Sequence, residues 1–220
     1  MRPSGKPPDL EAALAHLRGA DPVLARVIDE NPSFDPEAWI QRWPPLDLFG
    51  ALVLQVIGQQ ISVIAATAIF MRLLDHFGGA VPRPDDLAAV DPDVLRAVGL
   101  SGQKARTVRE IAARFRDGRV SDAEVRALSD DDAIARLTEI KGVGPWTAKG
   151  ALLLAHRRPD LVRSDDLALR HAVERQYHLD HVPSPAEVTE LARGWSPYGS
   201  LASSLLLASA HAPPGGTARR

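Results

Sequence analysis

Apolar residues recur at intervals of three or four along almost the whole chain, and this spacing restricts the fold more than any other feature. It gathers apolar side chains on one face of a helix, whereas a half-buried strand would alternate apolar and polar residues. No clean alternating run is present in the 220 residues. The sequence therefore predicts an all-α protein.

Prolines and small polar residues mark where the helices should begin. Asp35-Pro36 and Asp91-Pro92 each place a capping acid before a first-turn proline, and Ser184-Pro-Ala-Glu187 has the form of a capping box. The connections are short and rich in Gly, Pro, Asp and Ser. We expect helices at residues 9–18, 21–30, 36–42, 47–58, 61–77, 84–89, 92–98, 102–117, 121–127, 130–139, 145–156, 165–176, 185–193 and 197–210.

The residue types that are missing exclude several classes of protein. There is no cysteine, which excludes disulfide bonds, thiolate-bound metals and cysteine-ligated iron–sulfur clusters. The seven histidines form no H-x-x-x-H pair, which disfavours a metal-dependent helical enzyme. The first residues, MRPSGKPPD, lack a signal-peptide core, and apolar runs such as ALLLA at 151–155 are too short to span a bilayer. We therefore expect a cytoplasmic protein without a membrane partner.

Charge is distributed unevenly, although the net charge is only −2. Residues 100–120 carry six basic and two acidic side chains, and residues 141–175 carry seven and four, whereas residues 121–140 carry two and six. This segregation permits a basic face for nucleic acid on a nearly neutral protein. Ordinary charge alternation on solvated helix faces explains the pattern equally well.

The segment EIKGVGPWTA, residues 139–148, lies where one expected helix ends and the next begins. Pro145 suits a first helical turn, and Gly142 and Gly144 allow a tight bend and close approach of a partner. The loop therefore offers unpaired amides at the positive end of a helix, which suits a phosphate. The same glycines would also serve a plain turn between two helices.

A longer pattern surrounds these glycines. Leu137, Ile140, Gly142, Val143, Gly144 and Ala148 fit L-x-x-h-x-G-h-G-x-x-h-A, the pattern of the helix-hairpin-helix. Asp166 follows Trp146 by 20 residues, at a helix start that would stabilise its ionised carboxylate. Its neighbours Asp165 and Ser164 are of the kind that most often only cap helices.

Together with four further segments, this pattern resembles the 3-methyladenine DNA glycosylase II branch of the helix-hairpin-helix (HhH-GPD) DNA glycosylase superfamily. The segments are IGQQISVIAATAIFMRL (57–73), GLSGQKARTVREIA (99–112), RSDDLALRHAV (163–173) and RGWSPYGSLASSLLLAS (193–209). The resemblance covers roughly residues 20–210 and is to the compact form, without the N-terminal β-rich domain of larger members.

The resemblance implies a bilobal, all-α glycosylase fold with its active-site cleft between two helical subdomains. We expect a domain at 9–211, with one subdomain at about 51–149 and the other formed by 9–50 and 150–211. Residues 1–8 and 212–220 are expected to be flexible tails.

The resemblance also assigns roles to single residues. Asp166 aligns with the catalytic carboxylate, and Asp165 would be an auxiliary acid or a cap. Trp146 aligns with an aromatic residue that stacks on the damaged base. A tryptophan after a turn can also be simple packing, as we expect for Trp39, Trp43 and Trp195. The base pocket would further include Asp165, Gln59, Tyr198 and Leu207. The residues expected to contact DNA are Gln60, Ser62, Lys104, Lys141, Gly142, Val143, Gly144 and Thr147.

Some positions depart from the family's pattern. Gly150 and Leu207 stand where well-known members carry aromatic residues, so we expect a wider pocket. Gln60 falls at the position that wedges into the vacated base stack, where an apolar residue is usual. By resemblance, the backbone carbonyls of Ile140 and Val143 can hold a structural Na⁺ or K⁺. No cofactor is expected to be required.

The resemblance implies a monofunctional DNA glycosylase of base excision repair. It would flip alkylated purines of the 3-methyladenine and 7-methylguanine class out of double-stranded DNA and hydrolyse the N-glycosidic bond, leaving an abasic site. Lyase members carry a Schiff-base lysine where this chain has Trp146, and Lys149 does not fill that position. We expect a monomer associated with the nucleoid. The alternatives are a non-catalytic helix-hairpin-helix DNA-binding protein and a same-fold glycosylase for oxidised or mismatched bases.

Overall fold

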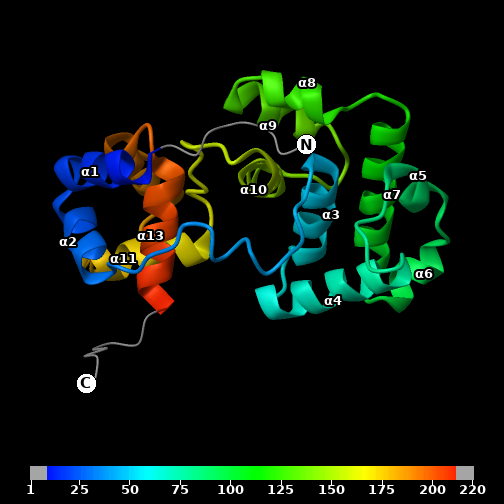
Figure 1. Ribbon diagram of the computed structural model, residues 1–220, viewed down its shortest axis with the longest axis horizontal. Coiled ribbons are helices and arrows are strands. Elements are labelled where there is room, and N and C mark those ends of the chain that lie inside the picture. Colours follow the sequence, from blue (N-terminus) through cyan, green and yellow to red (C-terminus); the bar gives the residue numbers. More distant parts are fainter. Residues whose placement is uncertain (1–8, 212–220) are drawn as a thin grey trace. The chain divides into compact units, whose positions relative to one another are not determined.

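The structure, a computed structural model, describes residues 9–211, and its regular elements in that range are all helical (Figure 1). The predicted all-α class is confirmed. In chain order the elements are α1 (Leu10–Ala20), α2 (Pro22–Glu30), α3 (Leu48–Gly58), α4 (Val63–His76), α5 (Pro84–Ala89), α6 (Pro92–Ala97), α7 (Gly102–Arg116), α8 (Asp122–Ala127), α9 (Asp130–Thr138), α10 (Pro145–His156), α11 (Leu167–Tyr177), α12 (Pro185–Ala192), the 3₁₀ helix η1 (Arg193–Trp195) and α13 (Gly199–His211). The two tails predicted to be flexible lie outside the described residues.

The helices belong to two compact units. The central unit, Ile40–Arg157, contains α3 to α10, and the terminal unit combines the chain up to Trp39 with the chain from Arg158 onward. The expected subdomain limits of about 51 and 149 divide the chain somewhat differently. The structure keeps α3 and α10 whole within the central unit because these two helices pack against each other.

Helix α3 forms the core of the central unit. Every residue from Leu48 to Ile57 is buried except Gln55. A helix that is apolar on all sides must be surrounded by other elements. Accordingly α4, α7 and α10 all pack against α3, and α5 and α6 pack against α7 (Figure 1).

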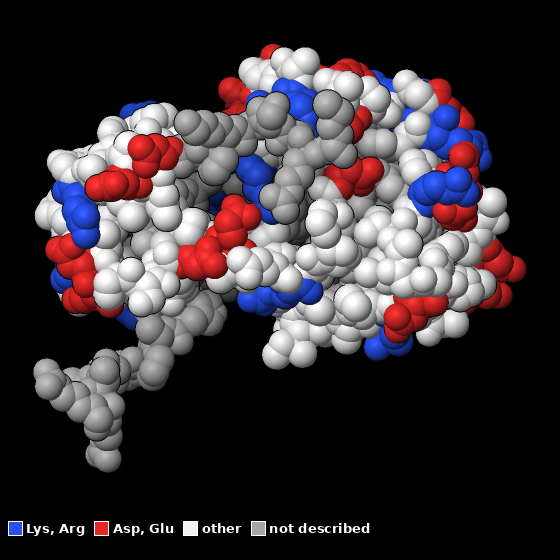
Figure 2. Space-filling model, viewed as in Figure 1, with Lys and Arg blue, Asp and Glu red and all other residues white. Residues whose placement is uncertain are grey.

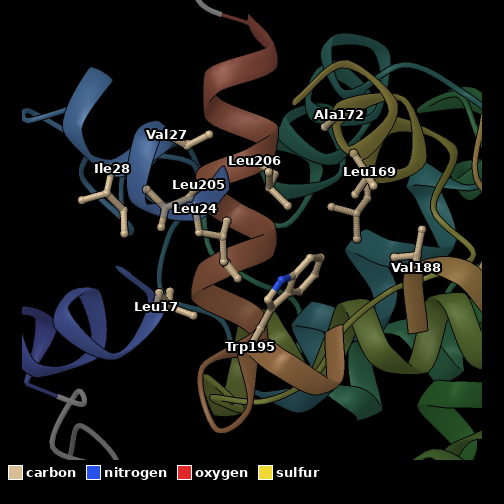
Figure 3. Packing of buried hydrophobic residues seen from close by; sticks show 12 residues of the cluster. Leu17, Leu24, Val27, Ile28, Leu169, Ala172, Val188, Trp195, Leu205 and Leu206 are labelled. Atoms are coloured by element: carbon tan, nitrogen blue, oxygen red, sulfur yellow. The ribbon is translucent and has the colours of Figure 1, made fainter. Parts of the chain in front are cut away.

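The terminal unit packs around Trp195, which is completely buried as the sequence predicts. Figure 3 shows its indole lying among side chains from both ends of the chain, including Leu24 of α2 and Leu206 of α13. Trp39 and Trp43, which we also expected to be packing residues, are only half-buried. The core of this unit therefore depends on a single tryptophan.

Asp21 joins three elements of the terminal unit. Its Oδ1 caps α2 by accepting from the amides of Val23 and Leu24, at 2.8 and 3.3 Å. Its Oδ2 accepts from the Tyr177 hydroxyl at 2.5 Å and from the Trp195 indole N–H at 3.3 Å. Burial raises the pKa of Tyr177, and the hydrogen bond to Asp21 adds to that effect. One carboxylate thus satisfies donors from α11 and η1 while it holds the start of α2.

The helix predicted at 36–42 is wrong, because these residues form successive turns. Asp35 does accept from the amide of Glu37 at 2.8 Å, as a cap would, but Ala38 bonds to the carbonyl of Asp35 three residues back. Pro44 and Pro45 follow closely, so a helix here would be short. Short helices without a packed apolar face are only marginally stable.

The other start signals behave as the sequence predicts. Asp91 caps α6 and accepts from the amide of Asp93 at 2.9 Å. Ser184 and Glu187 form a complete capping box, with Ser184 Oγ accepting from the Glu187 amide and the Glu187 carboxylate accepting from the Ser184 amide at 2.7 Å. Among residues 9–211, no helix has the length and apolar character needed to cross a bilayer.

Candidate nucleic-acid interface and carboxylate site

The hairpin loop, residues 139–144, connects α9 to α10 in the central unit. Ile140 and Val143 are buried and anchor the loop, while Lys141 and Gly142 are exposed. The amide of Val143 donates to the carbonyl of Ile140 at 2.9 Å. This amide is therefore used within the loop, and of the three amides expected to hold a phosphate those of Gly142 and Gly144 fit the role better.

The two glycines of the loop are required for different reasons. Gly142 has a φ of +91°, and a Cβ placed there would overlap the hydroxyl of Thr107 on α7. Gly144 has a φ of −96°, and a Cβ there would meet nothing within 4 Å. Gly144 also caps α10 without a side-chain hydrogen bond. The start of α10 is thus open, with no side chain in the place of an incoming anion.

The 59–62 loop, which joins α3 to α4, is bonded to the hairpin loop. Gln59 Nε2 donates to the carbonyl of Gly142 at 3.1 Å and to Thr147 Oγ1 at 2.9 Å. We expected Gln59 in the base pocket, and Thr147, which is 2% exposed, in contact with DNA. Both side chains instead make a contact inside the central unit, so their expected roles are not supported by this geometry.

Gln60, the expected wedge residue, is exposed and adopts a left-handed φ of +58°. For a residue with a Cβ this conformation costs about 1–2 kcal/mol. Ser62, expected to contact DNA, caps α4 by accepting from the amide of Ala65 at 3.2 Å. Beyond it Val63 and Ile64 are 53% and 84% exposed. The strained Gln60 therefore stands beside an exposed apolar surface.

Lys104, expected to contact DNA, is directed into the protein. Its Nζ donates to the carbonyl of Ile57 at 2.8 Å and to that of Gln59 at 2.7 Å. Burial lowers the pKa of its ammonium group. Lys141, by contrast, is exposed on the hairpin loop, where it can approach a phosphate.

Trp146 is half-buried in the first turn of α10. One turn later, on the same face of α10, lies Gly150. The space beside Gly150 is filled by Gln55 of α3, whose carboxamide would overlap a Cβ at that position. Gln55 Oε1 is buried and has no hydrogen-bond partner among the described residues. Gly150 therefore does not by itself widen a pocket, contrary to our expectation.

Asp166 lies in the terminal unit as the cap of α11. Its Oδ1 accepts from the amide of Ala168 at 2.9 Å, and its Oδ2 lies 3.1 Å from Nη2 of Arg163. The side chain is 21% exposed. Asp165 is exposed and does not cap the helix. The carboxylate is thus held by one backbone hydrogen bond and one ion pair, and it remains partly open to solvent.

Arg163 is the residue at this carboxylate that sequence reasoning missed. Burial lowers the pKa of its guanidinium, and the nearby carboxylates of Asp166 and Asp165 oppose that effect. The sequence could have indicated this ion pair, because Arg163 precedes Asp166 by three residues and such a spacing brings two side chains together across one turn. The pair makes Arg163 a restraint on the orientation of Asp166.

Tyr198 and Leu207, expected in the base pocket, both pack against the core of the terminal unit. The Tyr198 ring meets the ring of His16 edge-on, with centroids 5.3 Å apart. Both residues are half-buried. These contacts account for their positions by packing alone.

The carbonyls proposed to hold an ion can be tested by their hydrogen bonds. The Ile140 carbonyl accepts from the Val143 amide, which leaves one lone pair. Among the described residues no hydrogen bond is found to the Val143 carbonyl. Both carbonyl oxygens therefore keep lone pairs, which a hard monovalent cation would require of its ligands. In the same part of the chain no group of three or more His, Asp or Glu side chains is placed to bind a metal.

Three of the six basic side chains at 100–120 are paired with the two acidic side chains of the same segment, so its excess of positive charge remains. Arg114 pairs with Glu110 at 2.7 Å, and Arg116 and Arg119 share Asp117 at 2.9 and 3.2 Å. On the face drawn in Figure 2, Lys and Arg side chains lie beside Asp and Glu side chains and form no continuous basic surface.

Comparison with known proteins agrees with these features. The HhH-GPD superfamily base excision DNA repair protein model matches residues 53–197. The chain therefore belongs to this superfamily. It is 29% identical to DNA-3-methyladenine glycosylase 1 of Schizosaccharomyces pombe over 88% of this chain and 84% of that protein. It is 28% identical to the putative DNA-3-methyladenine glycosylase YfjP of Bacillus subtilis, over 71% of this chain but only 56% of that protein.

Among solved structures, the chain is similar to the Schizosaccharomyces pombe 3-methyladenine DNA glycosylase in complex with abasic DNA. The TM-score is 0.80 at 27% identity, over 91% of this chain and 98% of that one. The residues that the family model matches, 53–197, include both the hairpin loop and Asp166. The likeness confirms the helix-hairpin-helix glycosylase fold that the sequence predicted.

Proposed function

We propose that this protein is a monofunctional DNA glycosylase that removes alkylated purines, of the 3-methyladenine and 7-methylguanine class, from double-stranded DNA. The observation that carries the proposal is the match of nearly the whole fold to a 3-methyladenine DNA glycosylase bound to abasic DNA. The proposed product, an abasic site, is the kind of DNA in that complex.

The hairpin loop would bind the DNA backbone next to the damaged nucleotide. The amides of Gly142 and Gly144 and the ammonium of Lys141 supply donors and positive charge at the open start of α10. A Na⁺ or K⁺ held by the carbonyls of Ile140 and Val143 would add positive charge there. Since phosphate contacts release counterions, binding should weaken steeply as salt rises.

Asp166 would act on the sugar of the flipped nucleotide. A purine alkylated at N3 or N7 is cationic and leaves readily, so the barrier comes from positive charge that develops on the deoxyribose. A nearby carboxylate stabilises that charge and can orient the attacking water. Arg163 would keep the carboxylate of Asp166 in one orientation.

Trp146 would stack its indole on the cationic base, a contact worth about 0.5–2 kcal/mol. Because position 146 is not a lysine, no amine is supplied there to attack the sugar and form a Schiff base. The reaction should therefore stop at hydrolysis. We further propose that the protein acts as a monomer on the DNA of the nucleoid.

The test is to incubate the protein with methylated duplex DNA and to measure released bases and heat-labile abasic sites. Asp166→Asn should reduce release at least about 100-fold, because the negative charge that stabilises the positive charge developing on the sugar is lost. Asparagine caps helices about as well as aspartate, so α11 should persist. Asp165→Asn, on the exposed neighbour, is the matched control and should retain most activity.

Two results would contradict the proposal. Excision that survives Asp166→Asn would contradict the proposed role of the carboxylate. Release of only uracil or oxidised guanine would contradict the proposed substrate class. Borohydride should trap no covalent complex between the protein and DNA, because no Schiff base forms. DNA binding without any base release would instead indicate a binding protein.

A further inference from the structure

Two loops of the central unit that carry exposed residues are fixed to each other by side chains that are half-buried or buried. The 59–62 loop carries Gln60, and the hairpin loop carries Gly142 and Gly144. Gln59 joins them directly, through its hydrogen bonds to the Gly142 carbonyl and Thr147 Oγ1 at 3.1 and 2.9 Å. The spacing of the two loops is therefore set within one unit.

The start of α7 contacts both loops. Lys104 binds the end of α3 through the carbonyls of Ile57 and Gln59, at 2.8 and 2.7 Å. One turn further along α7, Thr107 is 4% exposed and lies against Gly142, where a Cβ would overlap its hydroxyl. The same helical turn thus fixes the 59–62 loop with one side chain and the hairpin loop with another.

The ammonium group of Lys104 donates hydrogen bonds to carbonyls at the C-terminal end of α3. The last carbonyls of a helix lack intrahelical donors and carry partial negative charge, which a cation complements. Lys104 gives these carbonyls an ammonium group, and the two oxygens give the half-buried ammonium group hydrogen-bond acceptors. No carboxylate is found beside its Nζ among the ion pairs of the described residues. An apolar side chain at 104 would leave both carbonyls without this donor.

Gln60 follows directly after the bound carbonyl and holds a left-handed φ of +58°. A residue with a Cβ stays in this conformation only when its surroundings hold it there. The carbonyl of Gln59 is bound by Lys104, and its side chain is bound by the hairpin loop. Release of Lys104 would therefore let the backbone at Gln60 relax and move relative to the hairpin.

We propose that Lys104 is a positioning residue that holds the 59–62 loop at a fixed spacing from the hairpin loop, and that it does not contact DNA itself. The expected effect on the excision rate rests on the proposed glycosylase function, whereas the spacing of the two loops does not. Both loops would engage one DNA molecule, so a change in their spacing should slow base removal more than it weakens binding to undamaged duplex.

The test compares Lys104→Met, which keeps the length of the side chain, with Lys104→Arg, which retains a donor cation. Lys141→Met is the matched control, because Lys141 is exposed on the hairpin loop. A lost phosphate contact lowers the slope of log Kd against log salt concentration by about 1. We expect that drop for Lys141→Met, whereas Lys104→Met should keep the slope of the unmodified protein.

Hydrogen exchange of the free protein gives the second measurement. In Lys104→Met, amides at 58–62 should exchange at least about 10-fold faster than in the unmodified protein, and those at 142–147 should also lose protection. Single-turnover excision should fall about 10-fold, and Lys104→Arg should recover it to within about threefold. Gln59→Ala removes the hydrogen bonds that join the 59–62 loop to the hairpin loop, and it should give the same exchange pattern. This variant is measured in place of Lys104→Met if that variant folds poorly.

A drop of about 1 in the salt slope of Lys104→Met, with unchanged hydrogen exchange, would show that Lys104 is a phosphate contact and overturn the proposal. Unchanged exchange and unchanged excision would overturn it as well. The salt slope and the exchange rates are measured on undamaged DNA and on free protein. They therefore decide the role of Lys104 even if the unmodified protein removes no alkylated base, which is the outcome that would reject the proposed function.

Discussion

At the scale of single residues, Gly142 and Gly144 look alike in the sequence but meet different surroundings. Gly142 combines a positive φ with a close neighbour, Thr107, whereas Gly144 combines an ordinary φ with open space. The first glycine is needed by the protein itself. The second leaves room for something outside the protein.

These surroundings predict opposite outcomes for the same substitution. Gly142→Ala should lower the free energy of unfolding by about 2–4 kcal/mol, from backbone strain plus overlap with Thr107. Gly144→Ala should change it by less than about 0.5 kcal/mol but weaken DNA binding about 10-fold, because the methyl group blocks close approach of a phosphate. Denaturant unfolding and a DNA titration measure both. Full DNA affinity in Gly144→Ala would show that the backbone of DNA does not approach this glycine.

At the scale of elements, the capping box of α12 links stability to pH. The backbone hydrogen bond from Ser184, with a further contribution from His181, lowers the pKa of Glu187 from 4.5 to about 2. A carboxylate whose pKa is lowered on folding favours the folded state above its unfolded pKa. The stabilisation that the ionised Glu187 gives to the folded state is therefore fully present above pH 4.5, and it is lost as the pH falls through the folded-state pKa of about 2.

Glu187→Gln should accordingly melt at a lower temperature than the unmodified protein at neutral pH. The difference should shrink as the pH falls below 4.5 and disappear once the pH lies below the folded-state pKa of about 2, because both side chains are then uncharged. Thermal unfolding over this pH range measures it. Glu190→Gln, in the exposed pair with Arg193, is the control and should show a smaller difference. A difference that stays constant with pH would mean that the charge of Glu187 does not stabilise α12.

Most helices were predictable because local signals determine them. Asp91 and Ser184 cap their helices as the sequence indicates, and the helix expected at 47–58 is present as α3. The predicted helix at 36–42 failed because a capping acid and a proline can also start a turn. Without a packed apolar face behind it, the start signal alone does not produce a helix.

The candidate site was predictable only in part, because its inner contacts join residues far apart in the sequence. The hairpin loop and the helix start at Asp166 follow from local patterns. The bonds of Lys104 to Ile57 and of Gln59 to Gly142 span 47 and 83 residues. Gln55 likewise fills the space at Gly150 only because α3 packs against α10. No local pattern reports such contacts, so residues assigned to DNA proved to be bonded inside the protein.

At the scale of the whole molecule, the two units have separate cores, and Asp21 belongs to only one of them. Asp21→Ala removes a helix cap and leaves the buried donors of Tyr177 and Trp195 without their acceptor. We expect a loss of about 2–4 kcal/mol in the stability of the terminal unit. Asp29→Ala, in the exposed pair with Arg18, should cost less than about 1 kcal/mol.

Hydrogen exchange can locate this loss. Amides of α2 and α11 should exchange faster in Asp21→Ala, whereas amides of α3 and α10 should keep their protection, since those helices pack around a different core. Equal acceleration in both units would show that the units unfold together and would contradict the expectation.

The division of the chain also has a consequence for synthesis on the ribosome. Residues 40–157 are continuous, so all of the central unit emerges before α11 is made. Helices α1 and α2 are made before the central unit and can pack against each other, but the core around Leu24 is completed only when α11, Trp195 and α13 have been made. Helices α1 and α2 therefore find their last partners only after the whole central unit has been made, and they expose apolar surface until then.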